Sequence, residues 1–326
     1  MIRIGLSTII SAVLTCCLCP FVLSSMRKLK AGQPILGYVT NHYSKSGTPT
    51  MGGIIFLLGA CVVGIIFNVG YSHYGVVTAV TALGYGVVGF LDDLIKIKGK
   101  NNQGLKAYQK LIGQFGIAII LAIFVAERTN TGRILNIPFS DFEINLGNFA
   151  VPIYAIFIVG VVNFVNLTDG LDGLVSTTGC IYLIAIGIIL YLSAITDPIN
   201  KTEFIGLSSF SISYGIALAV FFVLNSFPAK IFMGDTGSLA TGSVIALTCL
   251  LSGNALVFFM IGIVYVISGL SVVLQVFWFK ITKKRIFKMA PFHHHLERCG
   301  IHENKIVALY SLITLICSLG VITFWG

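Results

Sequence analysis

The chain has 326 residues, of which 56% are hydrophobic and only 10% are charged, and it carries a formal net charge of +9. Its mean hydropathy is +0.94. A water-soluble domain of this length needs far more surface charge, so the composition excludes one. Apolar runs of membrane-spanning length recur, and they lack the alternation at every second residue that is typical of barrel strands. The composition therefore predicts an all-α, polytopic membrane protein.

About ten apolar segments are long enough to cross a bilayer as helices. They are residues 4–24, 51–70, 74–92, 109–126, 149–167, 174–194, 204–225, 236–252, 255–279 and 304–324. We expect the first to be retained, since it lacks the small-residue cleavage site of a signal peptide. No long polar stretch separates the segments, so residues 1–326 are predicted to form a single transmembrane domain.

Basic residues divide the connecting loops into two groups. Most of the 21 Lys and Arg residues lie in or beside the loops 25–50, 93–108, 168–173, 226–235 and 280–303. These loops alternate onto one face, and an excess of Lys and Arg marks the cytoplasmic face. The pattern predicts a multi-pass membrane protein with both termini outside. It also accounts for the positive charge without a nucleic-acid partner.

Two shorter features refine this topology. Apolar and polar residues alternate near the end of residues 133–147, which predicts a small β-hairpin on the extracytoplasmic side. Lys283, Lys284, Arg285 and Lys288 are interleaved with apolar residues, which predicts a segment in contact with anionic membrane lipid. The eight cysteines show no metal-binding spacing, and we expect them to be free thiols.

Acidic residues gather where predicted helices meet the predicted cytoplasmic loops. Asp92 and Asp93 end one helix, and Asp235 begins another. Adjacent carboxylates at a bilayer boundary repel each other unless a cation or a proton stabilises them. Oxygen ligands of this kind suit Mg²⁺. The pattern predicts a magnesium site, although Asp235 alone could also be a helix N-cap.

The segment 163–173 carries four amide or carboxylate side chains. Asn163 and Asn166 are three residues apart and share a helix face, and Asp169 continues this spacing if the helix persists. Asp172 follows between two glycines, which allow the backbone to approach a ligand closely. A simple connection would not need these groups, so the segment predicts a binding site.

Three other segments favour anion binding. Gly234, Thr236 and Ser238 begin a helix, where free N–H groups can bind phosphate. Three consecutive histidines, His293–His295, cannot share one helix face, so phosphate binding is a better interpretation than zinc. In the segment 45–53, Lys45 and nearby hydroxyls can hold an anion, although its glycines equally suit tight helix packing.

Five strings resemble the signatures of the phospho-N-acetylmuramoyl-pentapeptide transferase family, within the superfamily of polyprenyl-phosphate N-acetylhexosamine-1-phosphate transferases. They are GTPTMGG (47–53), DDLIKIK (92–98), NFVNLTDGLDGL (163–174), FMGDTGSL (232–239) and APFHHHLE (290–297). The resemblance implies transfer of phospho-MurNAc-pentapeptide from UDP-MurNAc-pentapeptide to undecaprenyl phosphate, giving lipid I and UMP in peptidoglycan biosynthesis. It also implies a bacterial inner-membrane location, Mg²⁺, a cytoplasm-facing cleft, a homodimer and inhibition by nucleosides such as tunicamycin.

The resemblance also implies roles for individual residues. Asp235 matches the metal-binding aspartate, and Asp92 and Asp93 match an essential catalytic pair in which Asp92 is the candidate base. Residues matching nucleotide and sugar positions are Lys45, Thr50, Asn163, Asn166, Leu167, Asp169, Asp172, Asn225, Phe232 and Gln275. Residues matching phosphate or substrate positions are Lys110, His293, His294 and His295.

The sequence leaves mechanism and substrate open in part. The lipid phosphate could attack the donor's β-phosphorus directly, or an aspartate could form a covalent intermediate. Another UDP-HexNAc could be the donor within the same superfamily. A proton-coupled transporter is a more remote alternative, since it would place acids near the membrane midplane.

Overall fold

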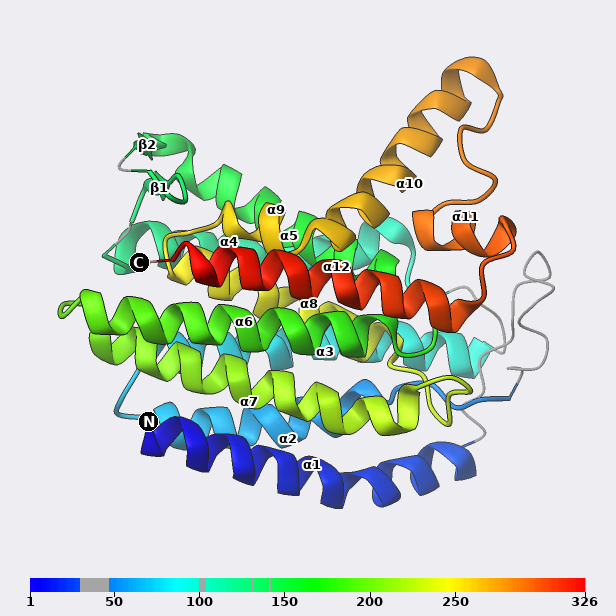
Figure 1. Ribbon diagram of the computed structural model, residues 1–326. Coiled ribbons are helices and arrows are strands. Elements are labelled where there is room, and N and C mark those ends of the chain that lie inside the picture. Colours follow the sequence, from blue (N-terminus) through cyan, green and yellow to red (C-terminus); the bar gives the residue numbers. More distant parts are fainter. Residues whose placement is uncertain (30–46, 100–103, 131, 141, 326) are drawn as a thin grey trace.

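A computed structural model describes residues 1–29, 47–99, 104–130, 132–140 and 142–325, and it is almost entirely helical (Figure 1). The helices are α1 (Ile2–Lys28), α2 (Gly53–Asn68), α3 (His73–Gly99), α4 (Ala107–Arg128), α5 (Ala150–Thr168), α6 (Leu174–Thr196), α7 (Lys201–Asn225), α8 (Gly234–Leu251), α9 (Val257–Ile261), α10 (Ile263–Thr282), α11 (Phe292–Arg298) and α12 (Glu303–Thr323). A 3-10 turn, η2 (Gly147–Phe149), precedes α5.

Among the described residues, nine helices are long and apolar enough to cross a membrane, and α2 is apolar but shorter. The predicted all-α, multi-pass fold is therefore confirmed. One predicted segment, 255–279, is divided into α9 and α10 at Gly262. A side chain at Gly262 would lie 2.7 Å from the Phe258 carbonyl oxygen, so this close turn requires glycine.

The predicted hairpin is also confirmed. Strands β1 (Ile134–Asn136) and β2 (Glu143–Asn145) pair antiparallel, with Leu135 opposite Ile144. The hairpin lies at the same end of the molecule as both chain termini (Figure 1). The short helix α11 lies at the opposite end, toward which α3 and α5 also run.

Helix α8 lies at the centre of the bundle, and 89% of its residues are buried. Small residues let other helices approach it closely, as is typical of membrane helices. A Cβ added at Gly89 of α3 would lie less than 3.0 Å from the Asp235 carbonyl oxygen, and one at Gly53 of α2 would lie equally close to the Gly237 backbone. These approaches fix the first turn of α8, and therefore Asp235, against α3.

Helix α10 is much less enclosed than α8, because only 33% of the residues in its most apolar 18-residue stretch are buried. It leaves the bundle at an angle and ends outside it, and the segment that follows runs back toward the bundle to α11 (Figure 1). Its last turns expose apolar side chains, including Phe277 and Ile281. In a membrane protein these side chains face lipid, so α10 carries its basic end away from the packed core.

Candidate active site

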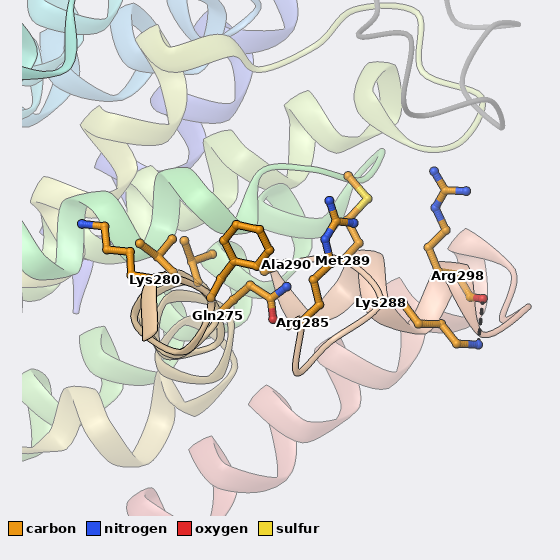
Figure 2. Close-up of a pocket in the computed structure, with 10 residues that line it drawn as sticks. Gln275, Lys280, Arg285, Lys288, Met289, Ala290 and Arg298 are labelled. Carbon is orange, nitrogen blue, oxygen red and sulfur yellow. Dashed lines mark hydrogen bonds between the residues drawn. The ribbon is translucent and has the colours of Figure 1, made fainter. Parts of the chain in front are cut away.

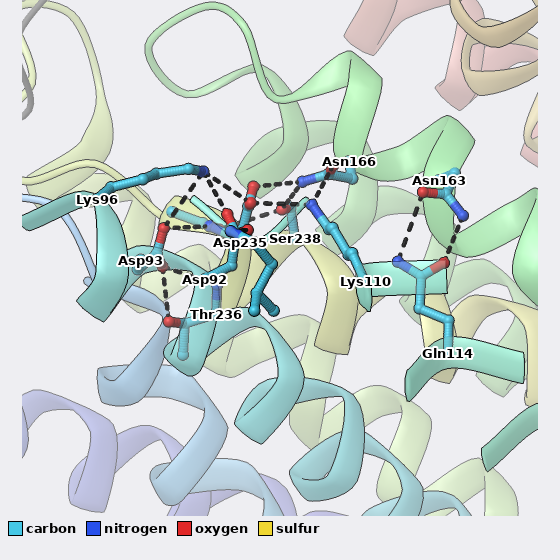
Figure 3. Close-up of polar contacts among 12 residues, drawn as sticks. Asp92, Asp93, Lys96, Lys110, Gln114, Asn163, Asn166, Asp235, Thr236 and Ser238 are labelled. Atoms are coloured by element: carbon cyan, nitrogen blue, oxygen red, sulfur yellow. Dashed lines mark hydrogen bonds and ion pairs between the residues drawn. The ribbon is translucent and has the colours of Figure 1, made fainter. Parts of the chain in front are cut away.

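Three carboxylates from two helices meet at the end of the bundle that holds α11. Asp92 and Asp93 lie in the last two turns of α3, and Asp235 lies in the first turn of α8. One ligand oxygen from each lies within 4.8 Å of the others. We call these three residues the carboxylate cluster (Figure 3). Asp92 and Asp93 are buried, so their charges require nearby cations or donors.

Asp93 caps helix α8 from the neighbouring helix. Its Oδ1 accepts from the Asp235 backbone N–H at 3.1 Å, and its Oδ2 accepts from the Thr236 N–H at 3.0 Å and the Thr236 hydroxyl at 2.7 Å. A carboxylate satisfies free N–H groups at a helix N-terminus and interacts favourably with the helix dipole. Asp235 is therefore not itself the N-cap, and the simple capping interpretation of that residue is wrong.

Two lysines neutralise much of the cluster's charge. Lys96 Nζ lies 2.6 Å from Asp92 Oδ2 and 2.8 Å from Asp235 Oδ2. Lys110 Nζ, from α4, lies 2.9 Å from Asp235 Oδ2. Figure 3 shows both ammonium groups directed toward Asp235. Lys96 was not predicted as a site residue, although its spacing of three and four residues from the two α3 aspartates was a readable signal.

Asn166 completes the contacts of Asp235. Its amide nitrogen donates to Asp235 Oδ1 at 2.7 Å and lies 2.7 Å from the Ser238 hydroxyl oxygen, while its Oδ1 accepts from Lys110 at 3.3 Å. Asn163, the first of the four polar positions predicted in the segment 163–173, bonds instead to Gln114 of α4 at 2.6 Å. Asn163 and Asn166 thus share one face of α5, as their spacing predicts.

The turn between α5 and α6 brings Asp169 and Asp172 to the same end of the molecule. Burial and, to a smaller extent, the negative charges of Asp235, Asp93 and Asp172 raise the pKa of Asp169 to about 8. The backbone N–H of Asp172 donates to Glu303 Oε1 at 2.6 Å. Glu303 was not predicted as a site residue, because it lies on α12 and is distant along the chain.

Asn225 and Asp172 hold this turn against the segment that follows α7. Asn225 Oδ1 accepts from the Gly173 N–H at 3.2 Å, and its amide nitrogen donates to the Ile231 carbonyl at 3.1 Å. Asp172 Oδ2 accepts from the Ala229 N–H at 2.9 Å. Gly173 has a φ of +81°, a conformation that favours glycine. Both predicted side chains are therefore engaged by the protein's own backbone.

The three histidines do not act as one group. A Cβ added at Gly170 would lie 2.5 Å from His293 Nε2 and 2.8 Å from His294 Nε2, so these two rings lie against the 169–173 turn. His293 is buried, and neither of its ring nitrogens has a hydrogen-bond partner among the described residues. Burial and the adjacent His294 hold the pKa of His293 well below its usual range.

His295 faces a different environment from the other two histidines. Its Nδ1 accepts from the Lys288 N–H at 3.1 Å. Its ring packs against Phe287 and Phe292, with ring centres 5.6 Å apart in each case. It therefore organises the segment before α11, away from Gly170.

Of the remaining predicted residues, Thr50 and Phe232 lie near the first turn of α8, and Leu167 lies on α5. A Cβ added at Gly234 would lie 2.6 Å from Asp93 Oδ2 and 2.8 Å from the Thr50 hydroxyl, so Thr50 adjoins the cluster. Phe232 is partly exposed and its backbone pairs with Pro49. Leu167 is partly exposed beside Asn166. Lys45 lies outside the described residues.

Gln275 lies at a separate cavity of about 860 Å³ between α10 and the segment that follows it (Figure 2). Its Oε1 accepts from the Ile286 and Phe287 N–H groups at 3.1 and 3.0 Å. The cavity is lined by apolar side chains together with Lys280, Arg285, Lys288 and Arg298. Apolar walls with a basic rim suit a ligand that has an anionic head and an apolar tail.

Comparison with known proteins places this geometry in a class of membrane transferases. Residues 75–253, more than half of the chain, match the model of Glycosyl transferase family 4. Residues 45–57 match the phospho-N-acetylmuramoyl-pentapeptide-transferase signature 1. The first match contains the whole carboxylate cluster, Lys110 and Asn166.

Full-length relatives narrow the class. The chain is 40% identical over 315 residues to a phospho-N-acetylmuramoyl-pentapeptide-transferase of Clostridium perfringens, covering 96% of this chain and 94% of that protein. It is 42% identical over 305 residues to one of Clostridium botulinum (93% and 91%), and 42% identical over 315 residues to one of Thermoanaerobacter pseudethanolicus (96% of each). The chain therefore belongs to the phospho-N-acetylmuramoyl-pentapeptide transferase family.

Proposed function

We propose that this protein transfers the phospho-MurNAc-pentapeptide group of UDP-MurNAc-pentapeptide to undecaprenyl phosphate, with release of UMP and formation of lipid I. Family membership supports the reaction. The observation that carries the proposal is the meeting of Asp92, Asp93 and Asp235 with two lysines at one end of the bundle. This is the charge arrangement that phosphoryl transfer requires, since its catalysis rests on positioning and electrostatic stabilisation.

The donor set of the cluster fits Mg²⁺, which prefers carboxylate and amide oxygens. Asp235 and Asp92 are the residues that would hold it, because both oxygens of Asp93 already cap α8. When bound, Mg²⁺ supplies neutralisation of phosphate charge. Asn166 and Lys110 orient the Asp235 carboxylate from the side of α5 and α4.

In this mechanism a lipid phosphate oxygen attacks the β-phosphorus and UMP leaves. Lys96 and Lys110 stabilise the negative charge of the phosphates, and Asp92 can accept a proton from the lipid phosphate. A phosphomonoester has a second pKa near ~6, so it is mostly ionised at neutral pH. Alignment of the lipid phosphate with the β-phosphorus, together with the positive charge around them, therefore contributes more to the rate than proton removal by Asp92 does.

The remaining groups provide binding surfaces for the donor and the acceptor. Asn166, Asp169 and Phe232 are assigned to the nucleotide, and Phe232 can stack on uracil. His293 and His294 are assigned to the diphosphate or sugar. The apolar walls of the cavity beside α10 are assigned to the acceptor's polyprenyl chain, and the acceptor's phosphate is assigned to the carboxylate cluster.

The proposal includes a setting in the cell. The protein lies in the cytoplasmic membrane with the carboxylate cluster facing the cytoplasm, where its nucleotide donor is found. It functions as a homodimer, and nucleoside inhibitors such as tunicamycin compete for the nucleotide site. Reporter fusions at the hairpin and near α11 test the orientation, and an outer location of α11 would contradict it.

The reaction is tested with purified protein, Mg²⁺, undecaprenyl phosphate and UDP-MurNAc-pentapeptide, following UMP release. We expect turnover with this donor, little with UDP-GlcNAc, and none after chelation of Mg²⁺. Asp235→Asn should abolish turnover while the protein remains folded, as shown by an unchanged elution profile. Full turnover by that variant, or a preference for UDP-GlcNAc, would refute the assignment.

The same preparation distinguishes direct transfer from a covalent intermediate. A covalent route exchanges labelled UMP into the donor without any lipid acceptor. Direct transfer gives no exchange. The hydrogen bonds that occupy both oxygens of Asp93 favour the direct route, because that side chain is not available as a nucleophile.

A further inference from the structure

A second polar contact joins α4 and α5 about one helical turn from the carboxylate cluster. The Asn163 amide nitrogen donates to Gln114 Oε1 at 2.6 Å, and the Gln114 amide nitrogen lies 3.5 Å from Asn163 Oδ1. Gln114 is completely buried, and Tyr85 of α3 donates its hydroxyl to the Gln114 backbone carbonyl at 3.0 Å. Figure 3 shows the two amides facing each other beside Lys110.

The polar contacts of α4 and α5 form two successive pairs. Lys110 pairs with Asn166 at 3.3 Å, and Gln114, one turn later on α4, pairs with Asn163, one turn earlier on α5. Residues three or four apart lie on the same face of a helix. The Gln114–Asn163 pair therefore shares its helix faces with the pair that contacts Asp235.

Helix α4 also buries small and apolar side chains, but within the described residues its side-chain hydrogen bonds to α5 come from Lys110 and Gln114. Its outer face exposes Ile112, Ile119 and Ile120, and it packs mainly against α5. Lipid is as apolar as these side chains, so packing and interhelical hydrogen bonds, and not burial, hold membrane helices in register. A slip of one turn would move Lys110 by about 5.4 Å, beyond reach of Asp235.

We propose that Gln114 and Asn163 form a register lock, a pair of positioning residues that holds Lys110 and Asn166 against Asp235. The inference rests on the proposed function of the carboxylate cluster. It replaces the expectation that Asn163 contacts nucleotide or sugar. Its amide nitrogen already donates to Gln114 and, at 2.7 Å, to the Val159 carbonyl.

A distance measurement tests the lock without relying on activity. Spin labels at the exposed residues Ile120 and Ile156 report the position of α4 along α5. We expect Gln114→Leu to shift or broaden the label-to-label distance by several ångströms, up to about the 5.4 Å pitch of a helix. The exchanged pair, Gln114→Asn with Asn163→Gln, should restore the original distance. An unchanged distance in Gln114→Leu would overturn the proposal.

Kinetics separate positioning from general stabilisation. Gln114→Leu should lower kcat about tenfold to a hundredfold with the KM for UDP-MurNAc-pentapeptide nearly unchanged, and the exchanged pair should recover most of the loss. The matched control is Ser208→Ala, which removes a buried hydrogen bond of 2.7 Å from α7 to the Gly187 carbonyl of α6. It should lower the melting temperature and leave kcat unchanged. An equal fall in kcat for both variants would assign Gln114 to stability alone.

The variant Lys110→Met distinguishes failure of the lock from failure of the site. Unimpaired turnover in Lys110→Met would contradict the proposed active site itself. Impaired turnover in Lys110→Met together with normal turnover in Gln114→Leu would overturn only the lock. Where residual turnover permits a double-mutant cycle, adding Gln114→Leu to Lys110→Met should cause little further loss, since contacts that act together are not additive.

Discussion

The carboxylate cluster and the histidine patch, formed by Asp169, Gly170, His293 and His294, lie at the same end of the protein but are built in opposite ways. Every carboxylate of the cluster bonds to protein groups: Asp93 to the first turn of α8, and the other two to Lys96. In the patch, the buried His293 ring has no hydrogen-bond partner among the described residues, and burial opposes ionisation of Asp169.

This difference separates two tasks within one site. A satisfied cluster is ordered before substrate arrives, so no rearrangement is needed when phosphate charge develops. Buried polar groups without partners destabilise the folded protein, typically by about 1–3 kcal/mol each. A substrate that supplies the missing partners recovers that free energy on binding. We therefore expect changes in the cluster to affect folding and chemistry, and changes in the patch to affect binding and pH dependence.

The largest effect is expected where α3 meets α8. A Cβ in Gly89→Ala would lie less than 3.0 Å from the Asp235 carbonyl and the Thr236 nitrogen, which are backbone atoms that cannot move independently. We expect a loss of about 3 kcal/mol in the free energy of unfolding, with loss of turnover. Thermal unfolding in detergent measures it. The control is Gly84→Ala on the same helix, where the nearest atom within 4 Å is a side-chain carbon of Ile117 at 3.5 Å. Equal melting temperatures for the two variants would contradict the close approach.

A smaller effect on stability should separate the two adjacent aspartates. Asp93→Ala leaves the Asp235 and Thr236 N–H groups without their cap, and we expect a loss of about 2 kcal/mol. Asp92→Ala leaves Lys96 paired with Asp235, so its melting temperature should fall less. Both variants should lose turnover. If Asp92→Ala were the less stable of the two, the assignment of Asp93 as the cap of α8 would be wrong.

Hydropathy predicted the fold well because each spanning helix carries its own apolar signal, independent of its neighbours. Asp92, Asp93 and Asp235 could be predicted as neighbours because topology alone brings the ends of α3 and α8 to one face. The contacts among them could not be predicted. Whether Asp93 caps α8 depends on how closely Gly89 lets the helices approach, and that is a tertiary property.

Long-range partners were the least predictable part of the site. Glu303 contacts the Asp172 backbone through the packing of α12 beside α6, and nothing in the local sequence marks it. Gln114 lies in an apolar segment, where a lone amide indicates only that a partner exists. His293 and His294 lie apart from His295 because they contact Gly170, which is in the connection between α5 and α6 and is distant along the chain.

The smallest expected effect concerns the pH dependence of stability, and it tests the histidine patch. Asp169 has a pKa of about 8 in the folded protein, raised from 3.8 by burial and by neighbouring carboxylates. A raised pKa means that the folded state binds the proton more tightly than the unfolded state does. The resulting stabilisation is complete below pH 3.8 and is lost as the pH rises through 8. Between pH 5 and pH 8, in the presence of a chelator, Asp169→Asn should therefore show a flatter decline in melting temperature than the parent protein.

The matched control for this measurement is Asp197→Asn, at the opposite end of the helices. Burial opposes ionisation of Asp197, but the hydrogen bonds from Asn200 and Ile199 together outweigh it and hold the pKa of Asp197 below its ordinary value. Its contribution is therefore constant between pH 5 and pH 8, and removing it should lower the melting temperature by the same amount at each pH. If Asp169→Asn behaved in this way too, Asp169 would be ionised in the folded protein. The patch would then be as well satisfied as the cluster, and the separation of tasks between the two regions would fail.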